Sequence, residues 1–360
     1  MSAALAEKGG RSHPTPSAAD SVHFRSGASR ISILGTESST TLTKEAAPLG
    51  IAKPVRIAIG VVLAAFALLV IVAPAFMGPG ERLPLTQTPT DFGLGFESVA
   101  FEPPDLPITI RAWWIPAARS KAAVVMVHGG GLDNRSLPYA NGLALAADLV
   151  AHGYSVLAID LRNYGESDAT PDHRITFGDS EANDVIGAMN YLGARHPGCR
   201  FGALGMSMGG ETALYAAARD RRLEAVVTDG TFAESGPIAA NFARAATGIP
   251  KFLLPPFLWS AEHLHAMHLS RGRALDVVGA IAPRPVLLIH NEADPIVPAE
   301  DARRLAAAIY SSELWITAAP VSVGDLGPFG THVQCYKLNP EEYVKRVTDF
   351  FDRVFGKRRA

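Results

Sequence analysis

A serine between closely spaced glycines has the local setting of an acyl-transfer nucleophile. The run GMSMG at 205–209 lies between an apolar stretch, 200–204, and an alanine-rich helical stretch, 211–219. In a strand-to-helix turn of this kind the flanking backbones come too close for a Cβ at either glycine. The pattern predicts a serine hydrolase with Ser207 as nucleophile, against the alternative of a chance match in a chain with 33 glycines.

A serine hydroxyl is a weak nucleophile, so the site needs a histidine to take its proton. Of the histidines that follow Ser207, only His332 lies in a glycine-containing loop after the last predicted strand, and we expect it to be the base. His290 ends an apolar strand, which is typical of a core residue. The cluster HLHAMH at 263–268 lacks the i, i+4 spacing of helical metal ligands, which favours a packing or solvated role.

Two aspartates are candidates for the carboxylate that orients this histidine. Asp294 lies in the loop 291–298, one predicted strand before His332, and Pro295 favours an extended backbone at Asp294. Asp229 also follows an apolar strand and lies closer in sequence to the serine. We expect Asp294 to be the acid, with Asp229 as the alternative.

Two backbone amides are expected to bind the oxyanion that develops during acyl transfer. One is the amide of Met208, which follows the nucleophile. The other belongs to the loop HGGG at 128–131, directly after the apolar strand 124–127. We expect Gly130 to supply it, with Gly129 as the alternative.

The order of these motifs resembles that of the α/β-hydrolase superfamily over residues 92–356. Within the superfamily, the segments 205–213 and 285–290 are similar to those of a bacterial branch of esterases and serine-aminopeptidase-like proteins, as is IDLR at 159–162 with Gly165 and Ser167. The resemblance implies a serine hydrolase that needs no cofactor and no metal.

The same resemblance implies structural roles for Asp160 and Arg162, outside the site. Two stretches depart from the usual pattern of the branch: HNEAD at 290–294 replaces His-Gly-x-x-Asp, and the loop before His332 lacks the usual Gly-x-Gly-His. Both departures affect the expected loop geometry and substrate preference.

The remaining patterns describe the scaffold that must position these residues. Short apolar runs alternate with helical patterns, which predicts a mostly parallel central sheet with helices on both faces. The predicted strands are 97–102, 108–115, 122–127, 155–160, 200–204, 225–229, 286–290 and 313–317; the predicted helices are 140–152, 180–195, 211–219, 299–310 and a last one from Pro340. The alternation fails at about 232–273, and we expect a small cap there.

The last helix has clear start signals. Asn339 is expected to be its N-cap, Pro340 occupies its first position and Glu342 stands where a capping box would place it.

A charge-free run of twenty residues, 57–76, precedes this domain and is long enough to span about 30 Å of hydrocarbon. We expect a disordered tail over 1–54, a transmembrane helix over 55–77 and a linker over 78–91. Lys44, Lys53 and Arg56 precede the run, which predicts a cytoplasmic N-terminus and an extracytoplasmic catalytic domain. A cleaved signal peptide and a secreted domain are the alternative, because APA at 73–75 resembles a cleavage site.

The composition narrows the range of partners. A net charge of −2 supplies no basic surface for nucleic acid, and two cysteines are too few for a disulfide framework, although one bond between Cys199 and Cys335 stays open. We expect a small acyl or ester substrate. A peptidase, a thioesterase and an acyltransferase are alternatives on the same triad, and a non-catalytic binding module is a remoter one. The sequence leaves the oligomeric state open.

Overall fold

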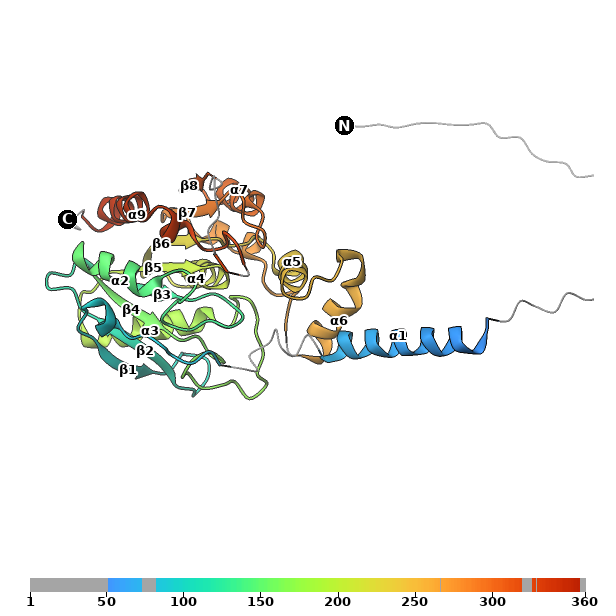
Figure 1. Ribbon diagram of the computed structural model, residues 1–360. Helices are drawn as coiled ribbons and strands as arrows, with labels where there is room; N and C mark the ends of the chain where they lie inside the picture. The colour runs from blue at the N-terminus through green and yellow to red at the C-terminus, as the bar shows by residue number, and fades with distance from the viewer. Residues whose placement is uncertain (1–50, 73–81, 266, 319–325, 328, 357–360) are drawn as a thin grey trace, which may run out of the picture. The chain divides into compact units, whose positions relative to one another are not determined.

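The computed structural model describes residues 51–72, 82–265, 267–318, 326–327 and 329–356, and its centre is a sheet of eight strands (Figure 1). The strands are β1 (Glu97–Phe101), β2 (Ile110–Ile115), β3 (Ala122–Val127), β4 (Tyr154–Ile159), β5 (Phe201–Met206), β6 (Leu223–Asp229), β7 (Val286–Asn291) and β8 (Ser312–Thr317). Each strand overlaps one of the predicted strands.

The spatial order of the strands is β1-β2-β4-β3-β5-β6-β7-β8. Strand β2 runs antiparallel to both β1 and β4, and all other neighbours are parallel. The chain therefore enters the sheet at the β1 edge, and its parallel part begins in the middle at β3, with β4 on one side and β5 to β8 on the other. The carboxyl ends of β3, β5, β6 and β7 meet at one edge, which is where ligands bind in such sheets.

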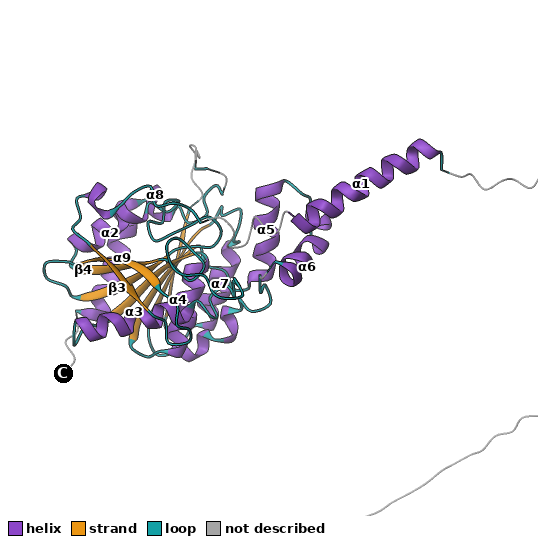
Figure 2. Cartoon of the chain, turned by 90° about the horizontal axis from the view of Figure 1, so that it is seen from below, coloured by secondary structure: helices purple, strands orange, loops and turns teal. Residues whose placement is uncertain are grey.

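Helices cover both faces of the sheet (Figure 2). The principal ones are α2 (Gly142–Ala151), α3 (Ala182–Arg195), α4 (Met208–Arg219), α7 (Ala299–Ala308) and α9 (Pro340–Phe355). One buried cluster joins the sheet to α3, α4 and α7, and a second joins its other face to α2 and α9. Because strands β3 to β7 are buried on both faces, their sequences are continuous apolar runs rather than alternating ones. The predicted fold class is confirmed.

The start of α9 differs in detail from the expectation. Asn339 does occupy the N-cap position and Pro340 the first helical position, but the Asn339 side chain makes no capping hydrogen bond. Glu342 instead accepts a hydrogen bond from Arg346 Nε at 2.6 Å, one turn further along the helix. The expected capping box is therefore absent from α9, because an ion pair at i, i+4 occupies its carboxylate.

Between β6 and β7 the chain forms an excursion of short helices. Its elements are α5 (Ser235–Thr247), the 3-10 helix η3 (Lys251–Leu253) and α6 (Pro255–Leu264), followed by the 3-10 helices η4 (Ala274–Asp276) and η5 (Val278–Ile281). We use "cap" for residues 232–265 and 267–273, which include α5 and α6.

The apolar run near the N-terminus forms the helix α1 (Lys53–Val72), and none of its residues is buried. It is the one helix in the described part of the chain that is long and apolar enough to cross a membrane. The predicted tail falls almost entirely outside the described residues, as do the end of the predicted span and the start of the predicted linker. The described end of that linker runs into the 3-10 helix η2 (Pro89–Phe92).

Candidate active site

Ser207 lies on a strained turn between β5 and α4. Its φ of 51° is in the left-handed region, which is costly for a non-glycine residue and frequent at catalytic positions. A Cβ added to Gly205 would lie 2.2 Å from the Gly209 carbonyl oxygen, and one added to Gly209 would lie 2.3 Å from that of Val127. Only glycine fits at either position, so the turn can lift the serine above the end of the sheet.

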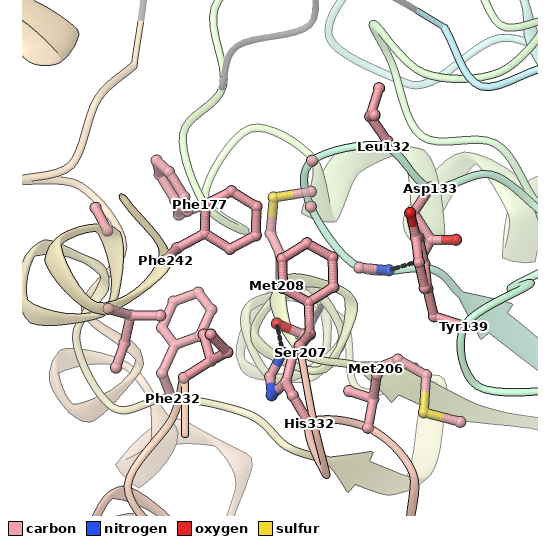
Figure 3. Close-up of a pocket in the computed structure, with 18 of the residues that line it drawn as sticks. Leu132, Asp133, Tyr139, Phe177, Met206, Ser207, Met208, Phe232, Phe242 and His332 are labelled. Carbon is pink, nitrogen blue, oxygen red and sulfur yellow. Dashed lines mark hydrogen bonds between the residues drawn. The ribbon is translucent and has the colours of Figure 1, made fainter. Parts of the chain in front are cut away.

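The three side chains expected to cooperate lie in one line of hydrogen bonds. His332 Nε2 is 3.0 Å from Ser207 Oγ, and His332 Nδ1 is 2.7 Å from Asp294 Oδ2 (Figure 3 shows the serine contact). An ionised carboxylate only accepts hydrogen bonds, so Nδ1 carries the proton and donates it to Asp294. Nε2 is then a free acceptor, and the serine hydroxyl donates to it.

The loop after β7 holds Asp294 in place. Its Oδ1 accepts hydrogen bonds from the amides of Ile296 at 2.8 Å and Val297 at 2.9 Å, which leaves Oδ2 for His332. The hydroxyl of Thr331 donates to the Ala293 carbonyl at 2.8 Å and joins this loop to the histidine loop. Both loops are thus positioned by backbone groups.

Asp229, the alternative acid, ends β6 and is fully buried. Neither of its carboxyl oxygens has a hydrogen-bond partner among the described residues, whereas its backbone carbonyl accepts the Ser207 amide at 2.8 Å. Burial raises the pKa of Asp229 to about 7, although the nearby Cys335 thiol and His332 lower it. The structure joins His332 to Asp294 by a hydrogen bond and gives Asp229 none to it.

The loop after β3 is fixed by two side chains that sequence reasoning missed. His128 Nε2 accepts the Leu161 amide at 3.0 Å, so Nδ1 carries the proton and donates to the Gly129 carbonyl at 2.7 Å. Asp133 Oδ2 accepts the Gly129 amide at 2.8 Å. Both polar groups of Gly129 are therefore engaged. In the sequence, Asp133 is a single acidic residue two positions after Gly131, and such a residue alone does not indicate a role at the site.

These contacts set the direction of the next amide. The Gly129 carbonyl and the Gly130 N–H share one trans peptide plane, so they point in opposite directions. With the carbonyl held toward His128, the Gly130 N–H points to the other side of the loop. A Cβ on Gly129 would lie 3.5 Å from Ser207 Cβ, and one on Gly130 would lie 3.6 Å from Met208 Cβ, so the loop is packed against the serine turn.

An apolar cavity opens beside Ser207 and His332 (Figure 3). Its wall away from the sheet comes from the cap and from the histidine loop, where Phe242 of α5 stacks on Phe329 with centroids 5.1 Å apart. Its apolar lining includes Phe177, Met208, Phe232, Ile238, Phe242, Met267, Ile296 and Phe329. The only carboxyl group in the described lining is Asp133, whose pKa is raised by burial.

The other histidines singled out in the sequence take no part in this line of hydrogen bonds, although His290 Nε2 lies 3.6 Å from Asp294 Oδ2. His290 Nε2 donates to the Val297 carbonyl at 2.8 Å, and burial lowers the pKa of His290, so the ring is a neutral core residue. His263, His265 and His268 each contact a different group, respectively the Trp259 carbonyl, the Ile71 carbonyl and the Arg174 guanidinium.

Asp160 and Arg162 are buried in ion pairs away from the serine. Asp160 pairs with Arg135, and Arg162 pairs with both Asp105 and Asp184 at 2.8 Å. Cys199 and Cys335 are both free thiols, so the disulfide left open by the sequence does not form.

Comparison with known proteins places this arrangement in a family. The family model described as alpha/beta hydrolase fold matches residues 122–258, from β3 into α6. The chain has the α/β-hydrolase fold, and its residues 122–258 match that family. The uncharacterized protein YfhR of Escherichia coli K12 is 25% identical over 261 residues, which cover 71% of this hydrolase and 80% of that protein. YfhR of Salmonella typhi is 26% identical over 230 residues, or 59% of this chain and 68% of the relative.

Solved structures share the fold. The esterase Pf2001 of Pyrococcus furiosus matches with a TM-score of 0.62 and 23% identity, covering 76% of this hydrolase and 98% of the esterase. A thermophilic esterase of Thermogutta terrifontis matches with a TM-score of 0.51 and 20% identity, covering 72% and 99%. A proline iminopeptidase of Mycobacterium smegmatis has a TM-score of 0.53 and 14% identity over 72% and 99% of the two chains. At these identities the likeness shows the fold alone.

Proposed function

We propose that this hydrolase is a membrane-anchored serine hydrolase that cleaves ester-type bonds through Ser207, His332 and Asp294. The observation that carries the proposal is the continuous line of hydrogen bonds from Ser207 Oγ through His332 to Asp294. Each contact is within hydrogen-bonding distance, and a His332 ring that donates from Nδ1 to Asp294 can accept the Ser207 proton at Nε2.

The expected reaction proceeds through an acyl-enzyme. Ser207 Oγ attacks the ester carbonyl carbon while His332 Nε2 takes the hydroxyl proton, and Asp294 stabilises the imidazolium that results. The amides of Gly130 and Met208 donate to the oxyanion; Met208 begins α4, where the first amides of a helix have no partner within it. His332 then protonates the leaving alcohol, and a water activated by His332 releases the acid.

The cavity lining supports an uncharged, apolar acyl group. Its walls carry aromatic and aliphatic side chains, and the one carboxyl in the described lining already accepts the amides of Gly129 and Asn134. A peptidase that selects a free N-terminus needs a carboxylate available to the ammonium group, and Asp133 is engaged elsewhere. We therefore favour esters over aminoacyl substrates; parallel assays with ester, thioester and aminoacyl compounds, with product analysis, test this preference.

The helix α1 supports the anchor. It is apolar throughout its middle and exposes its side chains on all sides except at the half-buried Phe66 and Val70. Lys53 and Arg56 at its start favour a cytoplasmic N-terminus, with the catalytic domain on the opposite side.

Labelling by a fluorophosphonate probe tests the nucleophile. We expect Ser207→Ala to abolish labelling, while Ser120→Ala, at the other edge of the sheet, labels as the natural protein does. Labelling that persists in Ser207→Ala would overturn the assignment.

A further inference from the structure

The segment formed by η3 and α6 carries two sets of apolar side chains: an inner face buried against α5, and a second set that is exposed. Leu254, Phe257 and Ala261 are spaced at helical intervals and are buried, Leu254 and Phe257 in a small core with Ala243 of α5. Four further large apolar side chains of the same segment are open to solvent. They are Phe252 and Leu253 of η3 and Trp259 and Leu264 of α6, with exposed fractions of 78%, 37%, 57% and 55%. We call these four residues the outer cap face.

Such exposure is unusual, because a soluble surface rarely gathers several large apolar side chains on one short segment. Packing against α5 does not require them, since the inner face already fills that contact. The flanking residues are Lys251, which is exposed, and His263, whose ring stacks on Trp259 with centroids 4.8 Å apart. Aromatic, basic and aliphatic side chains together are typical of segments at a membrane–water interface.

The position of α6 beside α1 points to the same partner. Both ribbon views place α6 against the C-terminal end of α1, with α5 between α6 and the sheet (Figure 1, Figure 2). His265 Nε2, just after α6, donates to the carbonyl of Ile71 at 2.5 Å. That carbonyl belongs to the last turn of α1, whose carbonyls lack partners within the helix.

This contact fixes the depth of the cap relative to the span. Ile71 is one residue before the described end of α1, on the side from which the chain continues to the catalytic domain. If α1 crosses the bilayer, α6 therefore lies near the membrane surface on that side.

We propose that the outer cap face inserts into the headgroup region of the phospholipid bilayer that α1 crosses. This inference rests on the membrane anchor of the proposed function. The inner side of the cap lines the cavity through Ile238, Phe242 and Met267. The cap thus lies between the lipid and the cavity beside Ser207, and substrates dissolved in the bilayer are the esters that this geometry favours.

Quenching of tryptophan fluorescence by brominated lipid tests the insertion directly. The full chain is reconstituted into phosphatidylcholine vesicles with or without bromine atoms on the acyl chains near the headgroup. The chain has four tryptophans, and Trp113 and Trp114 are buried in the domain. We expect bromine to remove roughly a quarter or more of the emission of the natural protein, in proportion to one lipid-exposed tryptophan among four.

Trp259→Phe is expected to lose this quenching, and the matched control Trp315→Phe is expected to keep it. Equal fractional quenching in the natural protein and in Trp259→Phe overturns the insertion. Intact mass of the reconstituted chain shows separately whether the apolar run is retained, and fluorophosphonate labelling reports on the serine site. These measurements therefore distinguish a cap face that does not insert from a chain that lacks its membrane anchor or its reactive serine.

A charged substitution on the outer cap face tests whether the insertion affects hydrolysis. We expect Phe252→Glu to lower the hydrolysis of a long-chain ester dissolved in the vesicles by about tenfold, because a carboxylate withdraws the cap from lipid. The same variant is expected to hydrolyse a short water-soluble ester at a rate within about twofold of that of the natural protein. Tyr310→Glu, at a site 86% exposed on the opposite edge of the sheet, is the control and leaves both rates unchanged. Equal loss on both esters in Phe252→Glu contradicts the proposal.

Discussion

An aspartate lies near His332 at the end of each of the neighbouring strands β6 and β7. The two aspartates differ in their hydrogen-bond partners. After β7, Asp294 accepts two backbone amides and the His332 ring. At the end of β6, Asp229 is buried with no hydrogen-bond partner within the described residues, and its pKa rises to about 7. A buried carboxylate stays charged where donors replace water, and is held neutral where they do not. Proximity to His332 alone therefore does not favour Asp229, and the hydrogen bonds of Asp294 support it as the proposed acid.

The largest effect that separates the two strand ends is expected from Asp294→Asn. An amide does not hold the Nδ1–H group of His332 as a carboxylate does, so the imidazole ring is no longer fixed in the required tautomer. The imidazolium that forms during the reaction also loses the negative charge that stabilises it. We expect the turnover number for a soluble ester to fall by about 10³- to 10⁴-fold. Circular dichroism serves as the folding control. A fall of less than tenfold in a folded variant would show that another group orients His332.

The second effect concerns stability and is expected from Asp229→Asn. The ordinary pKa of 3.8 rises to about 7 in the folded state, so the folded protein binds more protons than the unfolded chain between these values. The natural protein therefore loses stability as the pH rises through this window. Asp229→Asn removes the titration, and we expect its advantage in unfolding free energy to grow by about 1 to 3 kcal/mol between pH 5 and pH 8.

Thermal or denaturant unfolding at both pH values measures this difference. An advantage that stays constant with pH would contradict the neutral state of Asp229. The same variant also sharpens the catalytic comparison, because it keeps the shape of the side chain. Its turnover number is expected to stay within about tenfold of the natural value, against the far larger loss in Asp294→Asn.

The smallest effect is expected from Thr331→Val. This change removes the hydroxyl that joins the histidine loop to the Ala293 carbonyl and keeps the volume of the side chain. One hydrogen bond contributes about 1 kcal/mol to stability, so we expect the unfolding free energy to fall by about that amount and turnover to decrease two- to tenfold as the histidine loop loses this tether. A decrease as large as that of Asp294→Asn would assign the positioning of His332 to its own loop instead of to the acid.

The sequence was sufficient for the scaffold because buried parallel strands carry continuous apolar runs. Strand β3, from Ala122 to Val127, has the bounds expected from its composition alone. The start of α9 was harder: its N-cap position was predicted, but the side-chain pairing of Glu342 depends on Arg346, a competitor that the capping pattern ignores.

The site was predictable where chemistry and chain order restrict the choice of residue. Ser207, His332 and Asp294 follow from the glycine-flanked serine and from the order of the strand ends, and the structure brings them together. The choice between Gly129 and Gly130 was not decided by sequence. It depends on a peptide plane that His128 and Asp133 fix through space, and no spacing pattern records which amide a carboxylate occupies.

The order of strands in the sheet has a consequence for the time at which the protein becomes active. The proposed nucleophile Ser207 follows β5, the proposed acid Asp294 follows β7, and His332 comes after β8. Their contacts join residues separated by 38 and 125 positions, so they form only when distant parts of the chain have paired. Under the proposed mechanism, a ribosome-bound or half-folded chain would carry an unactivated serine. Hydrolysis would then begin only after the whole sheet has assembled.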